Sequence, residues 1–177
     1  MNKKDDIIQA AERLFYINGF HATSTDRICN EAGVSTRTLY RYFPSREVLT
    51  EAVLATRQER FFAALLPPEH SEAITRLFEV QSEWMQENGP LGCLFLKAWG
   101  EYAEEDRHLA ALALDYRYRQ REYISSCLRH SAGEALSDAV WMLFEGAITS
   151  ALILGPQAAI YAGEAAKKLL ATCGQKQ

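Results

Sequence analysis

Apolar residues along the chain recur every three or four positions, and no segment keeps the two-residue alternation that is typical of a surface strand. The first apolar stripe is formed by Ile7, Ile8, Ala11, Leu14 and Phe15. Gly19 follows this stripe and is expected in the left-handed position after a helix end, from which Phe20 can contact Phe15. The pattern therefore predicts an all-α fold whose first element is an amphipathic helix.

Short helices follow in the N-terminal third, and capping and breaking residues mark each of them. Ser and Thr side chains can cap a helix start, whereas Gly and Pro end helices. These signals are Thr23 or Ser24 with Gly33 for the second helix, Ser35 with Pro44 for the third, and Ser45 for the start of the fourth. Later helical patterns cover about 71–88, 91–103, 106–130, 134–154 and 157–173.

A stretch with two prolines, "PPEHS", follows Leu66 and separates the early helices from the later ones. The fourth helix could run without interruption as far as these prolines and link both parts, so the boundary is soft. We expect an N-terminal helical unit over residues 1–50 and a larger helical unit over residues 51–177. The sequence contains no internal repeat.

The charges are distributed unevenly between these two parts. The whole chain carries 19 Lys and Arg against 23 Asp and Glu, a net charge of −4, which by itself does not indicate a nucleic-acid partner. Residues 1–50 hold seven basic and six acidic residues, whereas the remainder holds twelve basic and seventeen acidic residues. A polyanion is therefore expected to meet the N-terminal third.

Several classes of protein are disfavoured by what the sequence lacks. The four cysteines lie far apart without a CxxC pair, and the histidines are scattered without metal-ligand spacing. No HExxH, Walker loop or nucleotide-binding glycine pattern is present. The first residues do not form a signal peptide, and no stretch approaches the length of a membrane span. We expect a cytoplasmic, non-enzymatic protein that holds no cofactor and no metal and does not enter a membrane.

The segment "VSTRTLYRYFPSREVL", residues 34–49, points to a helix-turn-helix. Cys29 is small where two helices must approach, Gly33 provides the turn, and Leu39 is the buried anchor of the next helix. Leu39 and Phe43 share the inner face of that helix. Its outer face then consists of Thr36, Arg37, Tyr40 and Arg41, which is the placement that a recognition helix uses in the major groove.

The residue types on this surface suit contacts with DNA. Arginine can pair with guanine, threonine can meet a base edge, and tyrosine hydroxyls can reach phosphate oxygens. Arg46 lies at the start of the next helix, where backbone amides already favour an anion. The alternative is the charged face of an ordinary helical bundle. The candidate DNA-binding residues are Ser24, Thr25, Ser35, Thr36, Arg37, Thr38, Tyr40, Arg41, Tyr42 and Arg46.

The stretch "AAERLFYINGFHATSTDRICNEAGVSTRTLYRYFPSREVLTEAVL" resembles the DNA-binding domain of the tetracycline-repressor (TetR) family. The resemblance implies that Thr36, Arg37 and Tyr40 face bases and that Tyr42 and Arg46 face the DNA backbone. It also implies a helix-turn-helix domain over residues 1–50 and a ligand-binding and dimerisation domain over residues 51–177. A regulator of this kind, more often a repressor, binds a palindromic operator in double-stranded DNA as a homodimer, and a small-molecule inducer releases it.

The C-terminal part is acidic and rich in aromatic residues. An aromatic residue at helical spacing usually belongs to the core, but the resemblance favours an inducer pocket among Phe95, Trp99, Tyr102, Tyr116, Tyr123 and Trp141. The arginines of "DYRYRQREY", residues 115–123, are interpreted as belonging to a solvated helix. The last two helices carry more apolar and small residues than one buried face needs. They predict a dimer interface that includes Ala147, Ala151, Leu154, Ile160, Tyr161 and Ala165, with a monomeric core as the alternative.

Two other functions stay open from the sequence alone. A small helical enzyme would need chemistry that no motif provides, and a sequence-nonspecific DNA-packaging protein would normally be more basic. A DNA shift assay separates the three classes. A regulator binds one palindrome specifically, an enzyme does not bind DNA, and a packaging protein binds all sequences uniformly.

Overall fold

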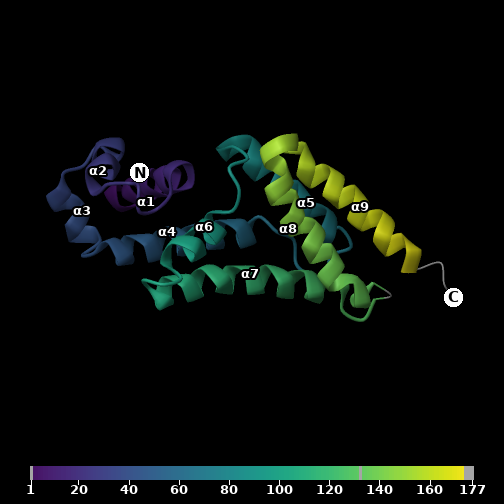
Figure 1. The fold of residues 1–177 in the computed structure, drawn as a ribbon. Helices are drawn as coiled ribbons and strands as arrows, with labels where there is room; N and C mark the ends of the chain where they lie inside the picture. Colours follow the sequence, from purple (N-terminus) through teal and green to yellow (C-terminus); the bar gives the residue numbers. More distant parts are fainter. Residues whose placement is uncertain (1, 132, 174–177) are drawn as a thin grey trace. The chain divides into compact units, whose positions relative to one another are not determined.

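The structure is a computed structural model that describes residues 2–131 and 133–173, and within these ranges it contains helices and no strand. The predicted all-α fold is confirmed (Figure 1). In chain order the elements are α1 (Lys3–Asn18), α2 (Thr25–Ala32), α3 (Thr36–Tyr42), α4 (Arg46–Ala63), α5 (Ala73–Asn88), α6 (Leu94–Tyr102), α7 (Arg107–Leu128), the short 3₁₀ helix η1 (Glu134–Leu136), α8 (Ser137–Leu154) and α9 (Gln157–Cys173).

At the end of α1 the side-chain contact expected from the sequence is present, but the backbone conformation of Gly19 differs from the expected one. The rings of Phe15 and Phe20 lie 4.6 Å apart, as the expected apolar contact requires. Gly19 has a positive φ of 87°, but its ψ of 167° is extended and lies outside the left-handed helical region. Glycine is still favoured, because L side chains rarely adopt this φ and because a Cβ at this position would lie 2.7 Å from the Oε1 atom of Glu101.

The next three helices begin where the capping residues predict. The Oγ atoms of Ser24, Ser35 and Ser45 accept hydrogen bonds from the third backbone N–H that follows each of them, at 3.1 to 3.3 Å. Gly33 ends α2 in the left-handed conformation, with φ 63° and ψ 35°. These caps fix a short turn between α2 and α3, which is the local geometry of a helix-turn-helix.

The chain divides into two compact units. The N-terminal unit contains the residues up to Arg60 together with Leu94–Tyr116, and the C-terminal unit contains Phe61–Cys93 together with the residues from Arg117 onward. Thus α6 and the first part of α7 belong with the helix-turn-helix. The boundary expected at residue 50 falls inside α4, which runs without interruption from Arg46 to Ala63.

Aromatic side chains form much of the core of the N-terminal unit. Phe15, Phe20 and Phe43 are almost completely buried. Tyr102 of α6 meets the ring of Phe20 edge-on, with 5.6 Å between the centroids. Burial of such large side chains is the main stabilising contribution in a domain of this size. The helix-turn-helix and α6 therefore share one core.

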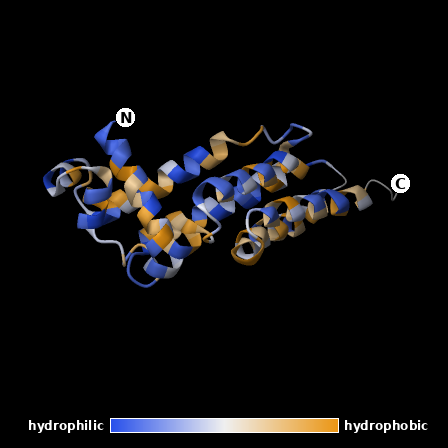
Figure 2. Cartoon of the chain, turned by 90° about the horizontal axis from the view of Figure 1, so that it is seen from above, coloured by the Kyte–Doolittle hydropathy of each residue, from blue (hydrophilic) through white to orange (hydrophobic). Residues whose placement is uncertain are grey.

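The core of the C-terminal unit is built from α5, α8 and α9. Small residues allow α9 to lie close to the other helices, and a Cβ on Gly163 would lie 3.0 Å from the Cβ of Phe78. Phe78 also packs edge-on against Phe144 of α8 at 5.8 Å. Ala151 is buried with residues of α5 and α9. Figure 2 shows hydrophobic residues around the start of α9, the helix whose other end leads to the C terminus.

Candidate nucleic-acid interface and ligand region

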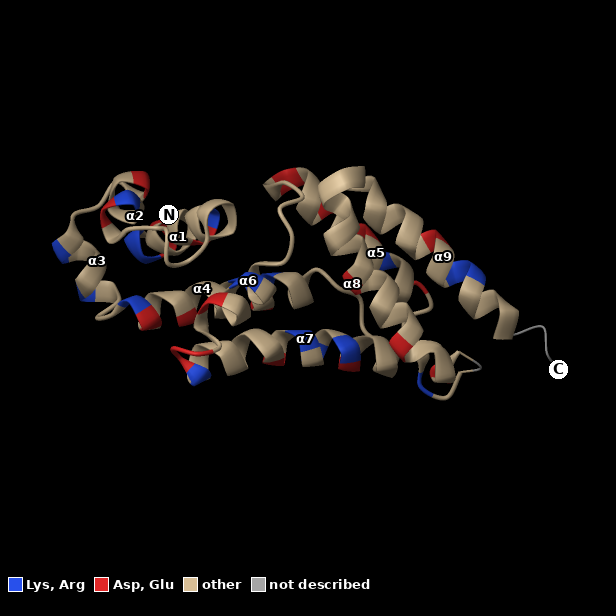
Figure 3. Ribbon diagram, viewed as in Figure 1, with Lys and Arg blue, Asp and Glu red and all other residues tan. Residues whose placement is uncertain are grey.

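The outer face of α3 is exposed, and its inner face is anchored in the core. Leu39 and Phe43 are each 2% exposed. The exposed residues of α3 are Thr36, Arg37, Tyr40 and Arg41. Positive charge on α3 is visible in Figure 3. The predicted inner and outer faces of α3 are therefore confirmed, while the contact of its outer face with DNA stays a prediction.

The hydroxyl groups among the candidate residues also shape the helix starts. Ser24 Oγ accepts a hydrogen bond from the Arg27 N–H at 3.3 Å. Ser35 Oγ accepts from the Thr38 N–H at 3.1 Å and lies 3.0 Å from Thr38 Oγ1. Thr25 is half-buried at the first position of α2. These residues position the surface whether or not they also contact DNA.

The arginines of α3 differ in their surroundings. In the part of the chain that the structure describes, the Arg37 guanidinium makes no hydrogen bond or ion pair. Arg41 lies over the ring of Tyr42, with 5.1 Å from its Cζ atom to the ring centroid. Tyr42 itself is half-buried at the end of α3. Arg37 is thus the more available group for pairing with a base edge.

The Arg46 side chain bonds to carbonyl groups inside the fold, whereas the sequence predicted a contact with the DNA backbone. Its Nη2 atom donates hydrogen bonds to the carbonyl oxygens of Phe20, at 2.7 Å, and Thr23. The guanidinium also lies 4.7 Å over the ring of Phe15, and burial lowers the pKa of Arg46. The physical reason is that the turn after α1 leaves carbonyl groups without helical partners. The Arg46 cation is used inside the fold, so the geometry favours a positioning role over the predicted phosphate contact.

A buried ion pair joins α1 to α4. Glu12 Oε1 accepts hydrogen bonds from Arg57 Nη1 at 3.0 Å and from Arg60 Nη2 at 2.6 Å. The side chains of Glu12 and Arg57 are 8% and 9% exposed, so this pair is largely removed from water. Removal of one partner from such a pair leaves a buried charge and is strongly destabilising.

Glu101 of α6 holds the turn between α1 and α2. Its carboxylate accepts hydrogen bonds from the backbone N–H groups of Phe20, at 2.9 Å, and His21, at 2.7 Å. The same carboxylate lies 3.1 Å from Nδ1 of His21, and Glu105 lies 3.1 Å from Nε2 of that ring. This arrangement was not predicted from the sequence, because no motif relates residues so far apart in the chain.

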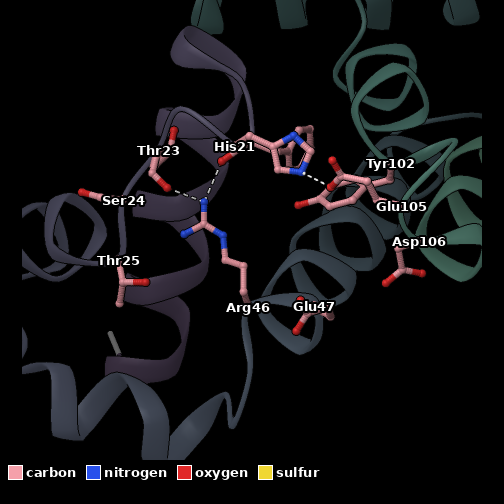
Figure 4. A pocket seen from close by; sticks show the side chains of 10 residues that line it. His21, Thr23, Ser24, Thr25, Arg46, Glu47, Tyr102, Glu105 and Asp106 are labelled. Carbon is pink, nitrogen blue, oxygen red and sulfur yellow. Dashed lines mark hydrogen bonds and ion pairs between the residues drawn. The ribbon is translucent and has the colours of Figure 1, made fainter.

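A cavity of about 500 Å³ lies beside this turn, within the N-terminal unit (Figure 4). Three candidate DNA-binding residues and one candidate pocket residue line it, together with acidic residues that follow α6. Burial raises the pKa of Tyr102 at this site. The lining residues are Phe20, His21, Thr23, Ser24, Thr25, Arg46, Glu47, Tyr102, Glu105 and Asp106.

The other candidate pocket residues of the N-terminal unit are placed differently from Tyr102. Phe95 and Tyr116 are buried and stack on each other, with 3.6 Å between ring centroids and 14° between the planes. Trp99 is 42% exposed. None of these three residues lines the cavity beside Tyr102. Phe95 and Tyr116 have core positions, and a ligand contact would be additional.

Two candidate pocket residues belong to the C-terminal unit. Tyr123 donates a hydrogen bond to the Leu66 carbonyl at 2.7 Å, and burial raises the pKa of Tyr123 and that of Cys127, the latter to about 11. Trp141 lies beneath the guanidinium of Arg117, with 5.8 Å from its Cζ atom to the ring centroid. Arg117 also forms an ion pair with Glu145, and its side chain is 17% exposed. The interpretation of Arg117 as a solvated residue is therefore wrong.

The predicted dimer residues divide into buried and exposed groups. Ala147 and Ala151 are buried in the chain's own fold, so they pack α8 internally and are not surface groups. Ile160 is half-buried, and Leu154, Tyr161 and Ala165 are exposed. Neighbouring apolar residues of α8 are exposed as well, namely Met142, Leu152 and Ile153.

The composition of this region also satisfies a test for membrane helices. Glu134–Leu154, which comprises η1 and α8, is long and apolar enough to cross a membrane, and 28% of its apolar window is buried. A helix that packs in a soluble bundle can pass the same test. Among the described residues no group of His, Cys, Asp and Glu is arranged to hold a metal ion.

The capped turn, the exposed outer face of α3 and the C-terminal helical bundle define a helix-turn-helix protein. Residues 7–53 match the family described as bacterial regulatory proteins, tetR family. The HTH-type transcriptional regulator UidR of Escherichia coli is 40% identical over 62 residues, which are 35% of this chain and 32% of UidR. RutR of the same species is 48% identical over 52 residues, which are 29% of this chain and 24% of RutR.

Similarity over the rest of the chain comes from solved structures. A TetR-family transcriptional regulator of Streptomyces coelicolor superposes with a TM-score of 0.86 at 22% identity, covering 98% of this chain and 96% of that chain. Residues 7–53 thus match the DNA-binding domain of the TetR family, and the described chain has the fold of a TetR-family regulator. The matches to the curated regulators UidR and RutR span about a third or less of their length.

Proposed function

We propose that this protein is a ligand-responsive regulator of transcription, of the repressor type, that binds a palindromic operator in double-stranded DNA. The observation that carries the proposal is the exposed face of α3 above its two buried anchors, Leu39 and Phe43. Arg37 supplies a guanidinium without an internal partner among the described residues, beside Thr36 and Tyr40. Such a face matches the donor and acceptor pattern of the major groove.

The proposal includes a homodimer that is formed through α8 and α9. Large apolar side chains are exposed on these helices, and Ile153 is 88% exposed. Isolated exposed apolar residues are ordinary, but a group of them on two neighbouring helices favours association. A second copy related by a two-fold axis would cover them and would place two α3 helices on successive major grooves, about 34 Å apart. A cytoplasmic location follows from this role.

Release by an inducer requires a link from the ligand domain to the helix-turn-helix. Within the N-terminal unit this link is supported by the two backbone hydrogen bonds that Glu101 of α6 accepts from the α1–α2 turn. A movement of α6 would pull on that turn, on Arg46 and thereby on the start of α4. Operator binding and inducer binding must then weaken each other by the same factor.

The test is selection of bound sequences from a random DNA pool, followed by affinity measurements on the selected palindrome and on a scrambled duplex. The proposal expects a strong preference for the palindrome and a loss of that preference in Arg37→Ala. The matched control is Arg129→Ala, which removes an exposed arginine of the C-terminal unit. Equal affinity for both duplexes would indicate a nonspecific DNA-binding protein, and absence of binding would reject the proposal.

A further inference from the structure

Buried polar atoms without a hydrogen-bond partner gather in the C-terminal unit. They include Oε1 of Gln81, Nη1 of Arg117, Oε1 of Gln120, Nε1 of Trp141 and Oε1 of Glu145. We refer to these five side chains as the polar cluster. Gln81 and Gln120 are 4% and 1% exposed. Since most buried polar groups in proteins have a partner, a cluster of exceptions indicates that something else supplies the partners.

The contacts of these side chains show that they lie together. Arg117 of α7 pairs with Glu145 of α8 and stacks over Trp141. Gln120 follows Arg117 by three positions and shares its helix face, just as Trp141 and Glu145 share a face of α8. The two faces therefore confront each other.

A further ion pair and a hydrogen bond mark the edges of this region. Arg121 donates to Asp138 at 2.7 and 2.9 Å; Arg121 lies one helical turn after Arg117 on α7, and Asp138 lies two turns before Glu145 on α8. From α5, Gln81 donates its Nε2–H to the Phe144 carbonyl at 2.9 Å, which leaves its Oε1 beside the same part of α8. Three helices thus contribute to one polar region.

We propose that the polar cluster binds a small uncharged molecule that carries both hydrogen-bond donors and acceptors, such as hydroxyl or amide groups. This inference rests on the proposed function, because it assigns the chemistry of the ligand that the C-terminal domain is proposed to bind. The cluster offers two donors, Arg117 Nη1 and Trp141 Nε1, and three acceptors on Gln81, Gln120 and Glu145. A hydroxyl or a primary amide can satisfy both kinds of group.

The charges of the cluster select against ions. Arg117 and Glu145 neutralise each other, so the site has no net charge from these groups. An anion that bonds to Arg117 would also lie beside the paired Glu145 carboxylate, and a cation that bonds to Glu145 would also lie beside Arg117, so each would meet a like charge in partly buried surroundings where such repulsion is strong. A purely apolar ligand would leave the five polar atoms without partners. An uncharged, polar molecule avoids both penalties.

Fluorine NMR of the fluorotryptophan-labelled full chain can test this selectivity without knowledge of the natural ligand. The chain has three tryptophans, and Trp99 lies exposed in the other unit, where it serves as an internal reference. The probes are acetamide and ethylene glycol, with acetate and ethylammonium as charged compounds of similar size. We expect saturable shifts of the Trp141 resonance, assigned with Trp141→Phe, for both neutral probes and no saturable shift for either ion.

Charge substitution distinguishes a binding site from a structural cluster. Glu145→Gln keeps the size of the side chain but leaves Arg117 as the only charge, so acetate should bind about tenfold more tightly than it does to the wild type. Arg121→Gln removes a neighbouring arginine outside the cluster and should keep the wild-type selectivity. If Glu145→Gln fails to fold, Gln120→Leu should still weaken acetamide by about three- to tenfold.

Two results would overturn the inference. A Trp141 resonance that neither neutral probe moves would mean that internal water or the protein itself satisfies these atoms. Similar shifts with all four probes would mean that the cluster has no selectivity. Operator binding is measured separately on unliganded protein, so failure here would leave the DNA-binding proposal standing, and failure of DNA binding would leave the ligand result standing.

Discussion

The two units differ in whether their buried polar groups have hydrogen-bond partners. In the N-terminal unit Glu12, Thr23 and Arg46 each have hydrogen-bond partners at normal distances. In the described chain the buried side-chain atoms without a partner all belong to the C-terminal unit. A fully paired network holds one geometry, which suits a surface that must fit DNA. An incompletely paired network suits a domain that receives a ligand.

The largest effect is expected where the paired network is broken at its most buried point. Glu12→Leu removes the partner of Arg57 and Arg60 and should lower the free energy of unfolding by about 3 to 5 kcal/mol. Urea unfolding measures the change. As a control, Glu31→Ala breaks the exposed Arg13–Glu31 pair and should cost less than about 1 kcal/mol. Equal effects of the two substitutions would show that burial does not distinguish them.

The second prediction separates the two possible roles of Arg46. If its guanidinium stabilises the α1–α2 turn, Arg46→Met should lower the free energy of unfolding by about 2 kcal/mol, the value of hydrogen bonds to a charged group. Operator affinity measured at several salt concentrations should then keep the wild-type salt dependence. A salt slope reduced by about one unit, with unchanged stability, would restore the phosphate contact that the sequence predicted.

Arg37 provides the matching test on the exposed side of the same unit. Arg37→Ala should reduce operator affinity by about 1 to 3 kcal/mol and relax the preference at one base position. Stability should stay within about 0.5 kcal/mol of the wild type, because the side chain is exposed and makes no hydrogen bond or ion pair in the described chain. A loss that is equal on operator and random DNA would assign Arg37 to phosphate instead.

The outcomes for particular residues show how far the sequence could predict this molecule. The cap at Ser35 and the buried anchors Leu39 and Phe43 follow from local spacing and were predicted, and Ser24 was one of two caps that the sequence offered for α2. The internal bonds of Arg46 were not predicted, because a cation beside a helix start looks the same in sequence whether it faces DNA or a carbonyl group. Local sequence patterns predict helices and their faces, but they do not reveal contacts between residues that are distant in the chain.

The candidate pocket and dimer residues illustrate the same limit in the C-terminal unit. Ala147 and Ala151 are small apolar residues, and small residues suit an internal helix contact as well as a dimer contact. Likewise, the resemblance to the family favoured a ligand region among aromatic residues but gave no reason to include Gln81 or Gln120. Their unpaired buried atoms become evident only when α5, α7 and α8 are placed in space.

A smaller effect is expected from the link between α6 and the helix-turn-helix. Glu101→Gln keeps the shape of the side chain but removes the charge that strengthens the bonds from the Phe20 and His21 N–H groups. Stability should fall by about 1 kcal/mol. If Glu101 transmits the inducer signal, the variant should also show weaker coupling between ligand and operator, measured as the ratio of operator affinities with and without inducer. Unchanged coupling would confine Glu101 to a structural role.

The smallest predicted effect is the pH dependence of stability that Glu145 causes in the incompletely paired network of the C-terminal unit. Burial raises the pKa of Glu145, and the nearby Arg117 only partly opposes this change. A carboxyl group whose pKa is raised on folding contributes stability that is fully present below its ordinary pKa and is lost as the pH rises through its folded value. The difference in unfolding free energy between the wild type and Glu145→Gln should therefore move in favour of the variant between mildly acidic and neutral pH. Urea unfolding of both proteins across this range measures the difference, in which the other titrating groups cancel. A difference that moved in favour of the wild type as the pH rose would mean that Arg117 lowers the pKa of Glu145 more than burial raises it, and the C-terminal cluster would then be as well paired as the network around Glu12.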